Sequence, residues 1–156
     1  MMCKGYGLMM GYYNKPKETA DSYDEEGWFH TGDTGIRRAD GYIRFLGRYK
    51  DMLKVGGENV AAAEVETYLA GHPAVKLAQV TGVPDDRLQE VVAAFVEKHD
   101  DQEVTEEELI AFCKGKIASY KVPRYVRFVT EWPMSTSKIQ KFRLRDQIMS
   151  ELGLSE

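Results

Sequence analysis

Cysteine is scarce in this chain, and other features are missing with it. Of the 156 residues only Cys3 and Cys113 are cysteines, and they lie far apart with no metal-type spacing. Two such residues do not make a disulfide framework. No apolar run approaches the ~18 residues of a membrane-spanning helix, and the N-terminal residues lack the apolar stretch and cleavage site of a signal peptide. We therefore expect a reduced, cytoplasmic protein.

A strong net charge and clustered histidines are also lacking. The formal net charge is −4, so the surface as a whole does not favour nucleic acid. His30, His72 and His99 are dispersed, and their spacing predicts neither a metal site nor a nucleophilic triad. With 43% apolar and 29% charged residues, the composition is that of an ordinary globular protein. The length suits one compact domain, or a small domain with part of another.

Short strands and turns are predicted in the first third of the chain. Residues 5–31 are rich in glycine, tyrosine and polar side chains, which indicates loop and short strands. Asp40-Gly41 separates two short runs, residues 36–38 and 42–46. This is a strong hairpin signal, because both turn positions tolerate positive φ.

From about residue 51 the pattern changes to alternating strands and helices. A second hairpin is predicted with its turn at Gly56-Gly57, and Thr105 with Glu108 forms a capping box at the start of a helix. The alternation predicts an α/β (α+β) fold, a small two-layer domain with a mixed sheet and flanking helices over residues 51–156. The expected helices cover residues 61–70, 106–117 and 142–152, and the expected strands cover 52–55, 75–83, 90–97 and 125–129, with a turn at 84–86.

Aromatic residues gather in the first fifty positions. The sequence predicts no helix there that could cover the hairpin-rich sheet these residues imply. We therefore expect this segment to pack on something absent from the chain. The aromatic residues are Tyr6, Tyr12, Tyr13, Tyr23, Trp28, Phe29, Tyr42 and Phe45.

Three segments carry recognisable motifs. The first is residues 27–33, Gly-Trp-Phe-His-Thr-Gly-Asp. The second joins residues 47–51, Gly-Arg-Tyr-Lys-Asp, to residues 54–60, Lys-Val-Gly-Gly-Glu-Asn-Val. The third is residues 133–141, Pro-Met-Ser-Thr-Ser-Lys-Ile-Gln-Lys. In this order and at these intervals, they resemble the ANL superfamily of adenylate-forming enzymes, in particular its acyl-CoA synthetase branch. The resemblance covers residues 7–144.

The first two segments supply candidate nucleotide ligands. A carboxylate only accepts hydrogen bonds, so Asp33 suits the two donors of a vicinal diol, and the resemblance implies that it holds the ribose of ATP. A turn residue bonded to its own backbone is the alternative. Arg48 offers a planar fork of donors for phosphate or ribose oxygens; the resemblance implies a nucleotide ligand, and a solvated arginine is the alternative. Asp51 matches the family's hinge, although an ordinary linker would look the same.

The Gly56-Gly57 turn is a candidate element of a CoA site. Backbone without side chains can lie close to a ligand, and the resemblance implies that this turn lines the pantetheine channel. Peptide-synthetase adenylation domains and luciferases usually have bulkier residues here, so the pair favours a CoA ligase.

A basic run of four residues follows the third predicted helix. It could meet the phosphates of CoA, but a solvated helix end is the more ordinary reading. The run comprises Lys114, Lys116, Lys121 and Arg124.

Lys138 is the candidate catalytic residue. A carboxylate that attacks the α-phosphate of ATP develops charge on the phosphoryl oxygens, and a lysine on a mobile loop can stabilise that charge by position alone. Two departures from the family pattern affect it. Ser137 stands where a glycine is usual, and the loop between Pro133 and Lys138 is one residue shorter. Lys138 nevertheless keeps its spacing to Lys141.

Taken together, the three motifs and the resemblance imply the C-terminal portion of an AMP-forming acid:CoA ligase. The expected substrates of that ligase are fatty acids. Residues 1–50 are then the end of an N-terminal nucleotide- and acid-binding domain, and residues 51–156 a C-terminal mobile lid. ATP/AMP and CoA are the expected cofactors, with Mg²⁺ arriving on ATP and no metal site in this chain. The partners expected are a carboxylic acid, ATP, CoA and the missing N-terminal domain, without which the chain is expected to be inactive. An adenylating enzyme with a carrier-protein acceptor and a non-catalytic interaction domain are the alternatives.

Overall fold

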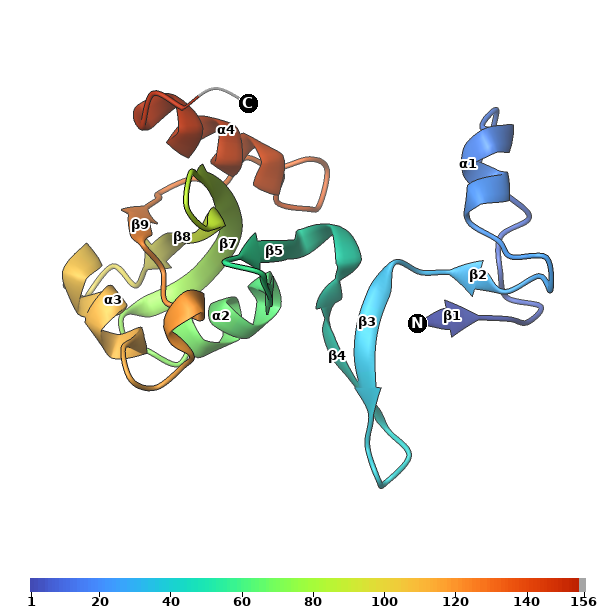
Figure 1. Ribbon diagram of the computed structural model, residues 1–156, viewed down its shortest axis with the longest axis horizontal. Coiled ribbons are helices and arrows are strands. Elements are labelled where there is room, and N and C mark those ends of the chain that lie inside the picture. The colour runs from blue at the N-terminus through green and yellow to red at the C-terminus, as the bar shows by residue number, and fades with distance from the viewer. Residues whose placement is uncertain (155–156) are drawn as a thin grey trace. The chain divides into compact units, whose positions relative to one another are not determined.

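The computed structural model of the protein describes residues 1–154 and divides into two compact units (Figure 1). Unit 1 comprises Met1–Lys50, and unit 2 begins at Asp51. None of the helices formed by residues 1–154 combines the length and the apolar content needed to cross a membrane.

Unit 1 consists of paired strands and one short helix. Strands β1 (Met2–Cys3) and β2 (Phe29–His30) pair antiparallel, as do β3 (Asp33–Arg37) and β4 (Ile43–Arg48). The hairpin predicted at Asp40-Gly41 is confirmed, with Gly41 at φ +86°. Hydrophobic side chains on this hairpin remain largely exposed, such as Tyr42 at 75% and Ile43 at 63%.

The helix in unit 1 was not expected from the sequence. Helix α1 (Pro16–Asp21) interrupts the segment predicted as loop and short strands. Pro16 stands in its first turn, where a fixed φ and a missing N–H cost nothing. The hydroxyl of Thr19 accepts from the backbone N–H of Tyr12 and donates to the carbonyl of Lys15, which ties the helix to the preceding loop.

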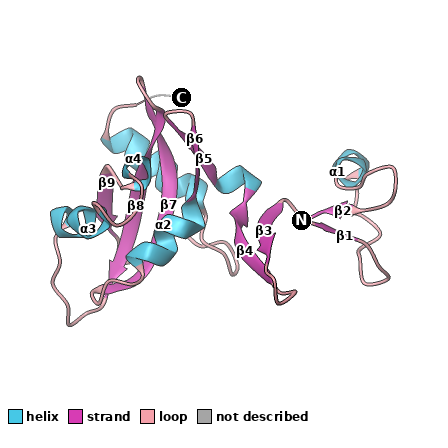
Figure 2. Ribbon diagram, turned by 60° about the horizontal axis from the view of Figure 1, so that its bottom comes forward, coloured by secondary structure: helices cyan, strands magenta, loops and turns pink. Residues whose placement is uncertain are grey.

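Unit 2 is built on a five-stranded mixed sheet (Figure 2). Four antiparallel strands lie in the order β6-β5-β8-β7, and β9 pairs parallel with β8. The strands are β5 (Met52–Val55), β6 (Glu58–Ala61), β7 (Val75–Asp85), β8 (Gln89–Lys98) and β9 (Tyr125–Phe128). The helices are α2 (Ala62–Leu69), α3 (Glu106–Cys113) and α4 (Lys141–Glu151).

Helices cover both faces of the sheet, as alternation along β8 shows. Val92, Ala94 and Val96 pack in one core cluster with side chains of α2 and α3. Their neighbours on β8 form a second cluster with Leu144 and Ile148 of α4. The predicted α/β fold with a mixed sheet and flanking helices is confirmed, and α4 adds a layer on the second face. Every apolar side chain that is buried among residues 1–154 belongs to unit 2.

Two of the element boundaries that differ from the prediction have clear physical causes. Strand β7 continues through Pro84 to Asp85, where a turn was expected. Proline is tolerated there because β7 pairs only with β8, so the missing N–H lies on the free edge. Helix α3 ends at Cys113, short of Ile117, and Gly115 adopts a left-handed φ of +71° just beyond it.

Candidate functional site

Asp33 and Arg48 lie opposite each other on the β3–β4 hairpin of unit 1. The strand register pairs the two residues, and Arg48 Nε donates a hydrogen bond to Asp33 Oδ1 at 2.8 Å. The aspartate side chain is 22% exposed and the arginine 44%. No side chain among residues 1–154 donates to Asp33 Oδ2. One carboxylate oxygen is therefore oriented by arginine, while the other can accept from a ligand hydroxyl.

Asp51 lies where the two units join along the chain. It is the last residue of a 3-10 helix, Tyr49–Asp51, and the first residue of unit 2. Its side chain is half-buried. The position coincides with the division between the units, and the hinge role stays a prediction.

The glycine turn has the backbone that its sequence predicts. Gly56 and Gly57 connect β5 to β6 with φ values of +59° and +86°, in the left-handed region that favours glycine. The N–H of Gly56 donates to the carbonyl of Leu88 at 2.8 Å, and a Cβ on Gly56 would lie 3.1 Å from the Leu88 side chain. A Cβ on Gly57 would meet nothing within 4 Å. One glycine is thus fastened to the β7–β8 turn, and the other faces open space.

Lys138 stands near the tip of a short hairpin between β9 and α4. This segment, residues 133–140, is called the Lys138 hairpin below. Met134 and Ile139 form an isolated antiparallel bridge across it. The Lys138 side chain is exposed, and none of the ion pairs made by residues 1–154 uses it. Its ammonium is therefore available to an anionic ligand.

Both ends of the Lys138 hairpin are attached to the rest of unit 2. At the first end, Trp132 Nε1 donates to Glu97 Oε2 on β8 at 2.6 Å, and the Trp132 side chain packs against the core beneath α4. At the second end, Lys141 Nζ donates to Glu66 Oε1 on α2 at 2.6 Å. The loop between Pro133 and Lys138 is therefore part of a hairpin whose two ends are held by hydrogen bonds and whose tip is exposed.

The basic run lies beside a groove of about 490 Å³ in unit 2. Two of its cations are committed to neighbours, because Lys121 pairs with Glu64 at 2.7 Å and Arg124 pairs with Asp85. Lys114 and Arg124 line the groove, whose other walls are largely apolar. The apolar walls include Val55, Leu88, Val91, Val92, Ile110, Tyr120, Val122 and Pro123.

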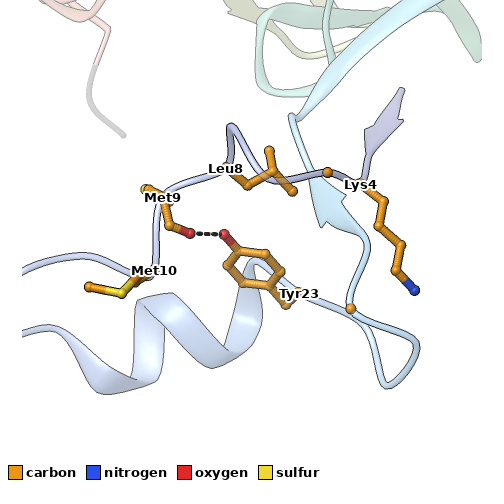
Figure 3. Close-up of a pocket in the computed structure, with 7 residues that line it drawn as sticks. Lys4, Leu8, Met9, Met10 and Tyr23 are labelled. Atoms are coloured by element: carbon orange, nitrogen blue, oxygen red, sulfur yellow. Dashed lines mark hydrogen bonds between the residues drawn. The ribbon is translucent and has the colours of Figure 1, made fainter.

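An open groove of about 500 Å³ in unit 1 offers little chemistry (Figure 3). The hydroxyl of Tyr23 donates to the carbonyl of Met9 at 2.5 Å. The ammonium of Lys4 donates to the carbonyl of Glu26, also at 2.5 Å. Both polar side chains in the groove thus bond to backbone carbonyls, and the rest of its lining includes the side chain of Leu8.

The structure brings some of the predicted site residues together and separates others. Asp33 and Arg48 form one cluster within unit 1. In unit 2, the Gly56-Gly57 turn and Lys138 belong to two different hairpins, and none of the hydrogen bonds among residues 1–154 joins them.

Two carboxylates support these hairpins, and the sequence motifs predict no role for either. Glu66 holds Lys141, as described above. Glu90 Oε2 accepts from the backbone N–H of Lys54 on β5 at 2.8 Å, and its Oε1 lies 3.7 Å from Arg145 Nη1 on α4. The hydrogen-bonded partners are 75 and 36 residues apart, respectively. No local sequence signal could have identified these contacts.

Folding shifts the pKa of several titratable groups in unit 2. Hydrogen bonds from the Lys76 ammonium and then from the Trp132 indole lower the pKa of Glu97. Burial raises the pKa of Cys113 to about 11, so this residue is a neutral thiol. Among residues 1–154, no three His, Cys, Asp or Glu side chains are grouped to hold a metal ion.

A known domain family matches part of unit 2. Residues 64–138 match the AMP-binding enzyme C-terminal domain. This stretch of unit 2 therefore belongs to that C-terminal domain family. The resemblance to adenylate-forming enzymes that the three motifs indicated is confirmed.

Two curated proteins are similar to nearly all of this chain. The mitochondrial medium-chain acyl-CoA ligase ACSF2 of Homo sapiens is 44% identical over 97% of it. The putative acyl-CoA synthetase YngI of Bacillus subtilis is 46% identical, also over 97%. The chain spans 25% and 28% of these two proteins, respectively, or about a quarter of the curated relatives it matches.

Solved structures of adenylating enzymes share the fold. ATP-bound MatB from Rhodopseudomonas palustris superposes with a TM-score of 0.86 at 33% identity, covering 94% of this chain and 29% of MatB. The anthranilate CoA ligase AuaEII in complex with anthranoyl-AMP also gives 0.86, at 35% identity, covering 98% and 30% of the two chains. The chain thus matches one portion of each of these longer proteins.

Proposed function

We propose that this chain forms the lid-bearing part of an ATP-dependent acid:CoA ligase. The reaction is carboxylate plus ATP to acyl-adenylate and pyrophosphate, followed by CoA to acyl-CoA and AMP. The observation that carries the proposal is an exposed, unpaired lysine on a hairpin stapled at both ends, in a chain whose relatives are acyl-CoA ligases. The similarity to ACSF2 supports a medium-chain fatty acid as the substrate.

In the first half-reaction, Lys138 is proposed to act on the reacting groups. Its ammonium would lie between the carboxylate and the α-phosphate and stabilise the charge that develops there, without transferring a proton. Asp33 would accept from the ribose hydroxyls through its free oxygen, while Arg48 orients the carboxylate and contacts the nucleotide. Magnesium neutralises phosphate charge when it is bound with ATP.

In the second half-reaction, the glycine turn is proposed to admit the pantetheine arm of CoA. Gly57 supports this role because a backbone with open space around it can be approached closely. The two half-reactions would then use different hairpins of unit 2. A rotation of unit 2 about Asp51 would bring first one hairpin and then the other to the bound substrates. A carrier protein in place of CoA would use the same turn.

A graft tests the proposal, because the chain matches only a quarter of its relatives. Residues 1–156 would replace the matching segment of ACSF2, and AMP release would be measured across a panel of carboxylic acids, with CoA present and absent. Native ACSF2 is the positive control, and the graft carrying Lys138→Ala is the negative control. We expect CoA-dependent AMP release with medium-chain acids. A folded graft that activates no acid would favour the non-catalytic interaction domain.

A further inference from the structure

Glu66 connects the Lys138 hairpin to the rest of unit 2. Its Oε1 accepts from Lys141 Nζ at 2.6 Å and from the backbone N–H of Val80 at 2.8 Å. The Val80 N–H lies on the free edge of β7, so the carboxylate joins helix α2, strand β7 and the first residue of α4. The Glu66 and Lys141 side chains are only 17% and 25% exposed. Solvent screens such a pair less than it screens a surface pair.

Lys141 connects Glu66 directly to the Lys138 hairpin. It is the first residue of α4, and it directly follows Gln140. The backbone N–H of Gln140 donates to the carbonyl of Pro133 at 2.8 Å, which closes the base of the hairpin. If Lys141 is released, the second strand of the hairpin loses its attachment three residues from Lys138.

A second glutamate on the same helix provides an internal contrast. Glu64 pairs with Lys121 through two hydrogen bonds of 2.7 and 2.8 Å. Lys121 lies in the 3-10 helix Ser119–Lys121 and not in the hairpin. The Glu64 side chain is 51% exposed. Two lysine–glutamate pairs on one helix thus differ in whether they hold the Lys138 hairpin.

We propose that Glu66 is a positioning residue for Lys138. Acting through Lys141, its charge holds the base of the hairpin on α2 and β7, so that the exposed lysine is presented in one orientation. Losing either charge frees the base of the hairpin while the sheet stays intact. The inference rests on the proposed function only in naming Lys138 as the group delivered, since the anchor itself needs no substrate.

Amide hydrogen exchange measured by NMR on the 156-residue chain tests the anchor. The Gln140 amide reports on the hairpin base, and the Phe95 amide on β8 reports on opening of the whole unit. We expect Glu66→Gln and Lys141→Met each to speed Gln140 exchange roughly tenfold, because a hydrogen bond to a charged group is lost. The Phe95 rate should stay the same.

Two further variants are controls. Glu64→Gln removes the other glutamate charge and should leave Gln140 exchange unchanged. Lys141→Arg keeps a cation and should restore exchange to within about twofold of the wild-type rate. The proposal is overturned if Glu66→Gln leaves Gln140 unchanged, or if Gln140 and Phe95 accelerate equally. Because no ligand enters this measurement, its failure would leave the proposed activity untouched, and an inactive graft would leave the anchor untouched.

Discussion

Replacing Gly82 by alanine should destabilise unit 2, because its missing side chain makes room for a carboxylate. A Cβ at Gly82 would lie 2.5 Å from Glu90 Oε1 and 2.8 Å from its Cδ, closer than real contacts allow. The carboxylate would have to move. Its present position lets it accept from the Lys54 N–H at 2.8 Å, so the movement breaks that hydrogen bond.

The expected cost follows from two opposing effects. A lost hydrogen bond to a charged group costs about 1.5–3 kcal/mol. Gly82 has no positive φ, so alanine also restricts the unfolded chain and returns about 0.4–1 kcal/mol. We expect the free energy of unfolding to fall by about 1–2 kcal/mol. The glycine turn should also loosen, because Lys54 lies two residues before Gly56.

Urea unfolding followed by Trp132 fluorescence measures this change. Trp28 would be replaced by phenylalanine, so that the signal comes from unit 2 alone. A double-mutant cycle supplies the control. In a Glu90→Ala background the obstructing carboxylate is gone, and Gly82→Ala should be neutral or slightly stabilising. An equal cost of Gly82→Ala in both backgrounds would refute the steric explanation.

Three further predictions concern the stability and reactivity of unit 2. Thr105→Ala removes the capping box of α3 and should lower the free energy of unfolding by about 1 kcal/mol in urea, whereas Thr105→Ser should not. The pKa of Glu97 is lowered by folding, so its ionised form stabilises the fold above its unfolded pKa near 4.5. That stability is lost as pH falls through the folded pKa; urea midpoints should drop less steeply there for Glu97→Gln, and equal slopes would contradict this. With the pKa of Cys113 raised to about 11 and Cys3 exposed, a thiol reagent at neutral pH should label Cys3 first, and equal rates would be inconsistent with the structure.

Local features of the fold were predictable from the sequence because local chemistry determines them. Asp40-Gly41 and Gly56-Gly57 both form the expected turns, and Thr105 caps its helix as predicted. Pro84 misled the prediction, since proline usually interrupts a strand. Whether a strand lies on the edge of a sheet depends on which strands pair with it. The residues around Pro84 carry no information about that pairing.

The motifs identify the candidate site residues, but they do not identify the residues that hold them in place. Asp33, Arg48 and Lys138 follow from the three segments. That Arg48 occupies one oxygen of Asp33, and that Lys141 is held by Glu66, depends on which strands and helices become neighbours. The motifs therefore identify the candidate site residues, whereas the carboxylates that hold the hairpins follow only from the folded structure.

Pyrophosphate exchange into ATP isolates the proposed role of Lys138 in adenylation, because it reports the first half-reaction alone. It would be measured with a medium-chain acid for the ACSF2 graft and its Lys138→Ala variant, beside conversion of supplied acyl-adenylate to acyl-CoA. We expect a loss of exchange of two or more orders of magnitude, roughly what removing one stabilising group costs, with the second conversion nearly unchanged. Equal exchange in the two proteins would contradict the role given to Lys138.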